Sequence, residues 1–483
     1  MNFPLVSLIL IPGLAALAIL FIRSVRIQLI GLLTIASFHL LLTMVLGLNL
    51  PVEELGSFLK LDSLGYLFLI LTSALFVATS FYSLHYLQGR THDTPSALHR
   101  FVPCLLGFLS MMTLVIVSHH LALMWAAIEA TTLASAPLIY FYRRKPALEA
   151  TWKYLMICSV GIALALLGTF AIGIARSAIA GEEGGFFLSS LQQHAAQFSK
   201  PWLKVAFILA LVGYGTKMGL APLHTWLPDA HSQAPSPVSA LLSGALLNCA
   251  FLGILRFYQI CVAAGEAAFA QELLLMMGIV SLVVATAFIL GQRDYKRLFA
   301  YSSVENMGIL AVGVGVGGAA TYGAMLHAVN HSLAKAGLFF LAGNILNAFG
   351  TTDAMKVRGV FQRVPVTGIL LIAGLFAIGG SPPFGLFVSE FTIFQAAINF
   401  HVWFGVLFLA LLSIAFLGMA GVIVPMVQGE PPAETVRMRV AGTRIFAVVA
   451  PLVLLSIVLV LGLYIPPFFR ELLEEAAHLV GAQ

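Results

Sequence analysis

Charged residues are the scarcest part of this sequence. Only 9% of its 483 residues are Asp, Glu, Lys or Arg, whereas 60% are hydrophobic. A soluble globular protein carries about 25% charged residues, because its surface must be hydrated. The shortage therefore excludes an ordinary soluble protein. Apolar runs of about 20 residues, long enough to cross a hydrocarbon core, recur along the whole chain and indicate a membrane protein.

Cysteine is scarce as well. The four cysteines, Cys104, Cys158, Cys249 and Cys261, include no CxxC pair. They are typical of small packing residues and exclude a disulfide framework or a metal site. Four scattered thiols cannot supply an iron–sulfur cluster either, so we expect no metal and no cofactor in this chain. The basic excess, net +5, sits at the ends of apolar runs and is not a nucleic-acid signal.

The apolar runs predict an all-α integral membrane protein with about fourteen transmembrane helices. Two of them contain helix-breaking proline and glycine. The seventh runs into "APLHTWLPDAHSQAPSP" and the twelfth contains "GGSPPFG". We place the spans at roughly 3–22, 28–50, 63–83, 101–118, 121–142, 154–175, 203–224, 238–260, 272–290, 304–318, 321–348, 365–399, 403–427 and 444–466.

The basic residues between these spans predict the orientation. With the N-terminus outside, five basic residues lie outside, at Lys60, Arg176, Lys200, Lys204 and Arg470. Sixteen lie inside: Arg23, Arg26, Arg90, Arg100, Arg143, Arg144, Lys145, Arg293, Lys296, Arg297, Lys356, Arg358, Arg363, Arg437, Arg439 and Arg444. Because Lys and Arg favour cytoplasmic loops, we expect both termini outside.

A weak internal repeat accompanies the two breaks. "PLHTWLPD" begins at Pro222 and ends on Asp229, and "PFGLFVSE" begins at Pro383 and ends on Glu390. The two copies lie five spans apart, so they cross the membrane in opposite senses, as in inverted-repeat transporters with paired broken helices. We expect a single polytopic domain over 1–483. Its parts are helices 1–3 in 1–100, a first repeat in 101–262, a second in 272–428, and the last helix with a short outer tail in 444–483.

Four charges lie well inside predicted spans: Glu129, Lys217, Lys335 and Glu390. Three more, Lys153, Arg256 and Glu305, are placed near span ends. A charge at the bilayer centre costs about 2.5–3.5 kcal/mol, so such residues face a bundle interior or a water path. The structural alternative is that they only pair and hold helices together. Glu129 and Lys217 are opposite in sign, and we predict an ion pair or a separation of one water.

"HAVNHSLAK" places His327, His331 and Lys335 at i, i+4 and i+8. On a helix these positions span about 80° of arc and about 12 Å of axis, so they form one titratable stripe. Histidine titrates near neutral pH, and three such groups can pass protons where water bridges them. The alternative for each histidine alone is a helix–helix hydrogen bond.

These motifs resemble a known family. The glutamate of the fifth span, "KMGLAPLHTWLPDAHSQAPSPVSALL", "HAVNHSLAKAGLFF" and "SPPFGLFVSEF" are similar to the antiporter-like subunits of complex I and of Mrp cation antiporters. "EATWKYLMICSVGIALALLG" and "YSSVENMG" most resemble the F-type subunit of hydrogenase-4 and of formate-hydrogenlyase-like NiFe hydrogenases. The resemblance covers essentially the whole chain. It implies fourteen helices with two inverted five-helix repeats, in a bacterial or archaeal cytoplasmic membrane.

The resemblance also implies proton translocation and roles for individual residues. Glu129 and Lys217 would be the coupled pair of the first half, Lys335 the relay of the second half and Glu390 its outer terminal group. Other members have a titratable relay in the eighth span, where this chain offers only Ser243 and Asn248. Asn248 either holds a bridging water or leaves a poor conductor. The supporting residues are expected to be His224, Asn248, His327, His331, Lys153, Asp229 and Glu305.

The partners implied are other membrane subunits and a peripheral redox arm that carries the NiFe and iron–sulfur centres. This chain would then be a subunit of an oxidoreductase complex without a catalytic redox centre of its own. Three alternatives remain: a subunit of an Mrp-type cation/proton antiporter, a non-conducting structural subunit, and a membrane partner in inorganic-carbon uptake.

Overall fold

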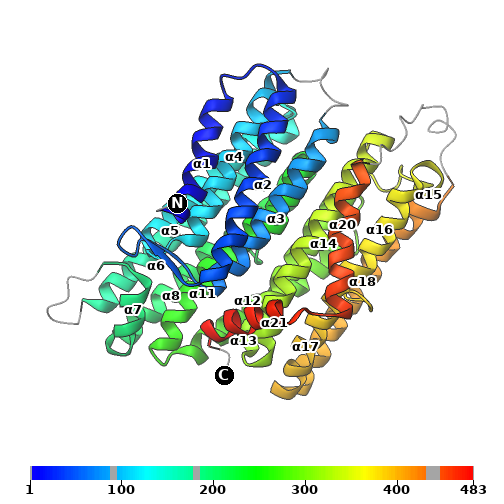
Figure 1. Ribbon diagram of the computed structural model, residues 1–483. Helices are drawn as coiled ribbons and strands as arrows, with labels where there is room; N and C mark the ends of the chain where they lie inside the picture. Colours follow the sequence, from blue (N-terminus) through cyan, green and yellow to red (C-terminus); the bar gives the residue numbers. More distant parts are fainter. Residues whose placement is uncertain (1–2, 88–94, 178–184, 431–445, 482–483) are drawn as a thin grey trace.

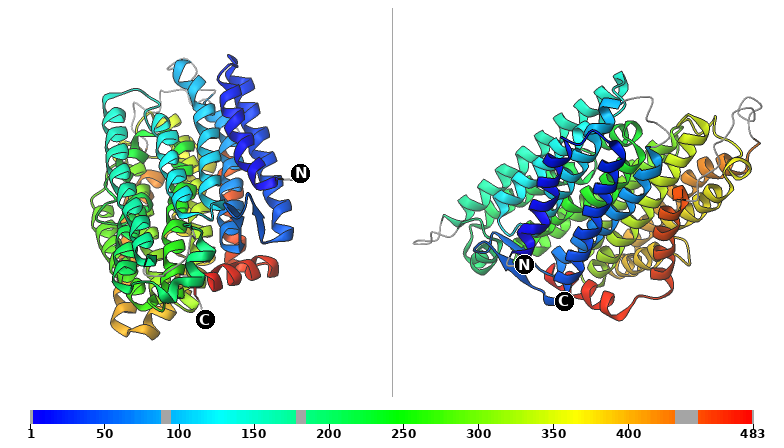
Figure 2. Two further views of the ribbon diagram at one scale, coloured as in Figure 1. Left: turned by 90° about the vertical axis from the view of Figure 1, so that its left-hand side faces the viewer. Right: turned by 45° about the horizontal axis from the view of Figure 1, so that its top comes forward.

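The protein is a bundle of long helices that run side by side (Figures 1 and 2). The computed structural model describes residues 3–87, 95–177, 185–430 and 446–481. Within these ranges, eleven helices are long and apolar enough to cross a membrane, and α1, α16 and α17 are shorter apolar helices. The prediction of an all-α membrane fold is confirmed.

The first part of the chain forms three helices and a small hairpin. Its elements are α1 (Pro4–Ile19), α2 (Val25–Leu46), the 3-10 turn η1 (Gly47–Asn49), β1 (Val52–Glu54), β2 (Leu59–Leu61) and α3 (Ser63–Tyr86). The two strands pair antiparallel, with Glu53 opposite Lys60. Asp62 caps the start of α3 by accepting a hydrogen bond from the Gly65 N–H at 2.8 Å.

The middle part holds the first broken helix. It contains α4 (Pro95–Val117), α5 (Leu121–Ile139), α6 (Lys145–Arg176), α7 (Leu188–His194), η3 (Ala195–Gln197), α8 (Lys200–Met218) and α9 (Trp226–Gln233). A continuous rod then combines α10 (Ser236–Leu241), the π-helical turn η4 (Leu242–Leu246) and α11 (Leu247–Ala263). Every residue in the most apolar stretch of this rod is buried, so it lies at the centre of the bundle.

The last part holds the second broken helix. It contains α12 (Ala267–Ile289), α13 (Tyr295–Val316), α14 (Ala319–Phe349), α15 (Val360–Arg363), α16 (Pro365–Ile378), α17 (Gly385–Phe400), α18 (Val402–Gln428), α20 (Phe446–Leu463) and α21 (Pro467–Leu479). The long helix α14 packs against α13, α17 and α20, so it joins the second broken helix to the centre.

Both predicted breaks are present. The first lies between α8 and α9, where Gly219 ends α8 in the left-handed conformation at φ 86°. The second lies between α16 and α17, and Gly380 within it has φ 61°. These glycines let the chain leave the helix where a side chain would strain the backbone.

A helix is found at each of the fourteen predicted ranges, with some ends shifted. The largest corrections are to the starts of α13 and α6, and α13 begins at Tyr295 and not at 304. Glu305 therefore lies in the middle of a helix, and its side chain is only 4% exposed. The prediction that it lies near the end of a span is wrong. Helix α6 begins at Lys145, so Lys153 lies two turns inside it. The number of membrane crossings, the repeats and the boundaries within 1–483 stay predictions.

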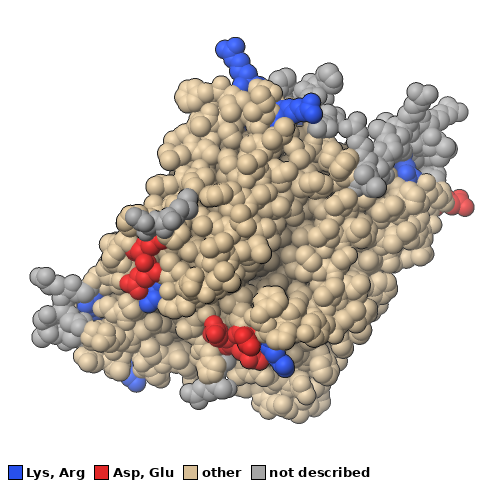
Figure 3. Space-filling model, in the orientation of Figure 1, with Lys and Arg blue, Asp and Glu red and all other residues tan. Residues whose placement is uncertain are grey.

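The charge distribution agrees with a membrane belt. Figure 3 shows charged side chains near the two ends of the bundle and a broad uncharged surface between them. Large apolar side chains such as Trp403 and Leu417 are 75% and 66% exposed, and exposed apolar surface of this kind is typical of contact with lipid or with a partner protein. The start of α1 and helix α21 lie at the end opposite the α1–α2 turn (Figure 1). Arg90, Arg437, Arg439 and Arg444 lie outside the described residues.

Candidate functional site

Lys217 is a fully buried charge in the last turn of α8. Its side chain is 0% exposed. The ammonium Nζ donates hydrogen bonds of 2.7 Å each to the hydroxyls of Thr132 on α5 and Tyr154 on α6. A cation near a helix C-terminus is also favoured by the helix dipole. Lys217 is therefore held in the bundle interior by neutral oxygens from two neighbouring helices.

Glu129 lies on α5 one turn before Thr132. Its carboxylate accepts a hydrogen bond from Ser159 Oγ at 2.7 Å and a long one from Thr132 Oγ1 at 3.5 Å. Among the described side chains, Glu129 and Lys217 form no direct ion pair. The hydroxyl of Thr132 instead links the two charged groups. The prediction was a direct ion pair or a single bridging water.

Close packing of α6 on α8 brings this cluster together. A Cβ at Gly161 would lie 2.6 Å from Thr216 Cβ, and a Cβ at Gly213 would lie 2.6 Å from the backbone nitrogen of Ala165. Glycines at such contacts let membrane helices approach closely. The approach places Tyr154 beside Lys217, which sequence reasoning missed because a neutral tyrosine does not stand out in an apolar helix.

The π-helical turn η4 packs against α14 and contacts α13. Ser243 in this turn shares a 2.8 Å hydrogen bond with Ser303 on α13. Asn248, in the first turn of α11, donates to Ser332 Oγ on α14 at 2.8 Å and to the Gly244 carbonyl at 3.0 Å. Its amide oxygen Oδ1 is buried and finds no hydrogen-bond partner in the described part of the chain. An orphaned acceptor of this kind suits a bound water.

Lys335 is a further buried lysine, on α14 and 0% exposed. Its Nζ donates a 2.7 Å hydrogen bond to the Phe299 carbonyl on α13. The hydroxyl of Ser303 donates to the same carbonyl at 3.1 Å, so Lys335 connects through Phe299 to the Ser243–Ser303 contact. Glu305 lies on the same helix as Phe299, and its Oε2 has no hydrogen-bond partner within the described ranges.

The two histidines of the stripe differ sharply. His327 bonds through Nδ1 to Ser389 on α17 at 3.0 Å and through Nε2 to Asn306 on α13 at 3.1 Å. His331 is equally buried, yet neither ring nitrogen has a partner among the residues described. The two rings stack with centroids 6.4 Å apart. The helix-linking alternative thus describes His327, whereas His331 is left with two open nitrogens.

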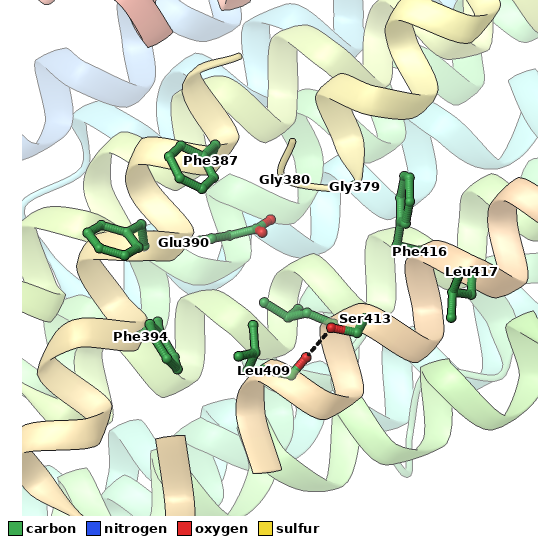
Figure 4. A pocket seen from close by; sticks show the side chains of 11 residues that line it. Gly379, Gly380, Phe387, Glu390, Phe394, Leu409, Ser413, Phe416 and Leu417 are labelled. Carbon is green, nitrogen blue, oxygen red and sulfur yellow. Dashed lines mark hydrogen bonds between the residues drawn. The ribbon is translucent and has the colours of Figure 1, made fainter. Parts of the chain in front are cut away.

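Glu390 lies in the second turn of α17 and borders a cavity of about 490 Å³ (Figure 4). The wall includes Phe387, Phe391, Phe394 and Phe416. Its carboxylate turns toward Gly380 in the break, where a Cβ would overlap it. No hydrogen bond or ion pair holds this carboxylate among residues 3–87, 95–177, 185–430 and 446–481. The residue before it in the chain, Ser389, contacts His327.

Asp229, Lys153 and Arg297 form a separate ionic cluster. The two Asp229 oxygens contact Lys153 Nζ at 3.0 Å and Arg297 Nη2 at 3.1 Å. Lys153 and Arg297 are 46% and 39% exposed. This cluster ties α9 to α6 and α13 at the margin of the bundle, outside the buried line of groups. His224, in the first break, is 5% exposed and lies near the rings of Phe288 and Tyr301.

Comparison with known proteins gives three informative matches. Residues 118–416 match the family described as "NADH:quinone oxidoreductase/Mrp antiporter, TM". "Hydrogenase-4 component F homolog" of Methylacidiphilum infernorum (isolate V4) is 37% identical over 434 residues, which are 88% of this chain and 89% of that protein. "Hydrogenase-4 component B" of Escherichia coli (strain K12) is 30% identical over 80% of this chain and 60% of that protein.

A solved structure shares the whole fold. A chain of the membrane-bound sulfane sulfur reductase, described as an archaeal respiratory membrane complex, superposes with a TM-score of 0.87. The superposition covers 99% of this chain and 97% of that chain, at 20% sequence identity.

Proposed function

Because the chain belongs to the NADH:quinone oxidoreductase/Mrp antiporter transmembrane family, we propose that it is the proton-translocating membrane subunit of a hydrogenase-type redox complex. The family resemblance expected from the motifs is confirmed. One observation carries the proposal: two lysines that are 0% exposed, Lys217 and Lys335, stand in a row of hydroxyl, amide and imidazole groups within apolar helices. Ionisable groups are costly inside a bilayer and mark ion paths there.

The proposed path has two halves. In the first, a proton moves between Glu129 and Lys217 by way of the Thr132 hydroxyl. In the second, Lys335 exchanges a proton with His331, and Glu390 is the terminal group toward the outside. A water on the open Oδ1 of Asn248 would bridge the halves, since Asn248 itself does not titrate. The alternative of a poor conductor predicts little transfer across Asn248.

The supporting groups receive separate roles. His327 is proposed to hold α14 on α13 and α17, and the cluster of Lys153 and Asp229 to hold α9 in place. Glu305 supplies a carboxylate on α13, the helix that accepts the Lys335 hydrogen bond. His224 is proposed to line the first break.

The driving reaction is proposed to take place on partner subunits. The NiFe and iron–sulfur centres belong there, together with other membrane subunits around this chain. Relatives at 37% and 30% identity carry hydrogenase-4 names, which favours a redox complex over an Mrp-type antiporter. We place the protein in a bacterial or archaeal cytoplasmic membrane with both termini outside, on the basis of the loop charges.

Lys335→Met tests the proposal, because methionine keeps much of the side-chain length and removes the charge. The purified complex should assemble and keep its redox activity in detergent. In sealed vesicles its proton uptake per electron should fall more than about tenfold, as for loss of a positioned proton-transfer group. Pumping equal to the parent would show that the buried stripe is structural. Copurifying subunits identify the complex, and a set of small antiporter subunits without a redox protein would favour the Mrp alternative.

A further inference from the structure

The Lys217 ammonium donates its hydrogen bonds to neutral oxygens and not to the Glu129 carboxylate. Its two acceptors are the hydroxyls of Thr132 and Tyr154, each at 2.7 Å. Glu129 lies beyond Thr132, whose hydroxyl is 3.5 Å from Oε2. The distance between the ammonium and the carboxylate therefore cannot exceed the sum of the Lys217–Thr132 and Thr132–Glu129 distances. Opposite charges attract strongly at short range inside a protein. A structural constraint must therefore keep Glu129 and Lys217 from direct contact.

Tyr154 is held in place by several contacts besides its hydrogen bond with Lys217. Its hydroxyl also shares a 2.7 Å hydrogen bond with Ser135 on α5. Its ring packs on Trp226 with centroids 5.0 Å apart. The indole N–H of Trp226 donates to the Thr216 carbonyl at 2.8 Å, next to Lys217 in the chain. Tyr154 is 0% exposed, so its hydroxyl has little freedom to follow a moving lysine.

We propose that Tyr154 is a positioning residue for Lys217. Its hydroxyl holds the ammonium away from Glu129, so that the two charges exchange a proton through Thr132 and do not close into a direct ion pair. This inference deepens the proposed function and rests on it. Without the Tyr154 hydroxyl, Lys217 loses one of its two acceptors, and the Glu129 carboxylate is the strongest acceptor within reach. A closed pair would hold its proton and slow transfer.

Tyr154→Phe is the direct test, because it removes the hydroxyl and keeps the ring on Trp226. We expect redox activity of the whole complex to persist while proton uptake per electron in vesicles falls about tenfold, which corresponds to one hydrogen bond to a charged group. Tyr214→Phe is the matched control. Tyr214 on α8 is also 0% exposed, and its hydroxyl has no partner in the described structure. That variant should pump within twofold of the parent.

A second readout separates positioning from mere packing. An electron cryomicroscopy structure of the Tyr154→Phe complex should show Lys217 Nζ within 4 Å of a Glu129 oxygen. Ser135→Ala removes the other hydrogen bond of Tyr154 and should reduce pumping about threefold, which keeps the test available should Tyr154→Phe fail to assemble. Full pumping by Tyr154→Phe, or by Ser135→Ala in that event, would overturn the inference. An unmoved Lys217 would do so as well.

Lys217→Met distinguishes the two levels of failure. If Lys217→Met stops pumping while Tyr154→Phe pumps as the parent does, only the positioning role is wrong. If Lys217→Met also pumps normally, the proposed proton path through the first half is wrong.

Discussion

At the residue scale, two identical side chains in one helix have opposite surroundings. His327 is bonded at both ring nitrogens, to Ser389 and Asn306, whereas His331, one turn later, has both nitrogens open within the described chain. A doubly bonded imidazole contributes to helix packing. An imidazole with open nitrogens can bind water and protons. The neighbours on α13 and α17, and not the residue type, assign the role.

This contrast predicts different losses for the same substitution. His327→Phe leaves Ser389 and Asn306 without their partner and should destabilise the protein by about 1–3 kcal/mol. His331→Phe removes no hydrogen bond and should therefore destabilise the protein less than His327→Phe does, yet lower pumping more than about tenfold. Melting curves of the purified complexes and proton uptake in vesicles measure the two effects. Equal melting temperatures for both variants would contradict the assignment.

The sequence predicted the charged residues of the site better than the neutral ones. Lys217, Lys335, Glu129 and Glu390 were detectable because a charge in an apolar run is costly. Thr132 and Tyr154 were not, since hydroxyl side chains are common in membrane helices and their partners depend on how helices pack. The link through Thr132 therefore required the structure.

At the scale of elements, the early start of α13 shows why one boundary was misplaced. Residues 295–303, "YKRLFAYSS", contain Lys296 and Arg297, so their hydropathy predicts a loop where the structure has a helix. Nearly all of α13 is buried by other helices. A hydropathy pattern reports the cost of facing lipid, so a helix enclosed by protein can begin with polar residues. The two breaks were predicted because proline and glycine act locally.

The contact of α6 with α8 predicts a sharp contrast between neighbouring glycines. Gly213→Ala places a Cβ 2.6 Å from the Ala165 backbone, so the helices must separate at a cost of about 1–3 kcal/mol. Gly215→Ala, on the same helix, meets its nearest atom at 3.5 Å and should be tolerated. We expect a lower melting temperature and weaker pumping for Gly213→Ala alone, because Tyr154 and Lys217 sit on the separated helices. Equal behaviour of the two variants would refute close packing here.

At the scale of the whole molecule, one ion pair joins distant parts of the chain. Arg256 on α11 contacts both oxygens of Asp62, the cap of α3, at 2.6 and 2.8 Å. Gln259, one turn later, donates to the Leu479 carbonyl at the end of α21. Burial by itself would raise the pKa of Asp62, but the charge and hydrogen bonds of Arg256, together with the Gly65 N–H and His119, outweigh it and the pKa is lowered. The first, central and last segments are thus fastened at one end of the bundle.

Arg256→Met should therefore destabilise the entire protein by about 3–5 kcal/mol at neutral pH, because Asp62 would remain as an uncompensated charge. A carboxylate with a lowered pKa contributes stability above its unfolded value of about 3.9, and this contribution is lost as pH falls through the folded pKa. The difference in melting temperature between parent and variant should be full at pH 7 and shrink below about pH 4. A difference that does not depend on pH would show that lost packing, and not charge, is responsible.

The enclosed rod of α10, η4 and α11 has a consequence for how this protein is made. Its neighbours α3, α4 and α8 precede it in the chain, whereas α12 and α14, which also pack against it, follow it. Helix α13, which contacts it through Ser303, follows it too. A polypeptide that enters the bilayer in the order of its synthesis exposes one flank of this rod until the later helices arrive. Arg256 can reach Asp62 during that interval, because α3 has already been inserted. Ser243 and Asn248 can bond to Ser303 and Ser332 only afterwards, so these contacts of the rod with α13 and α14 form late in biogenesis.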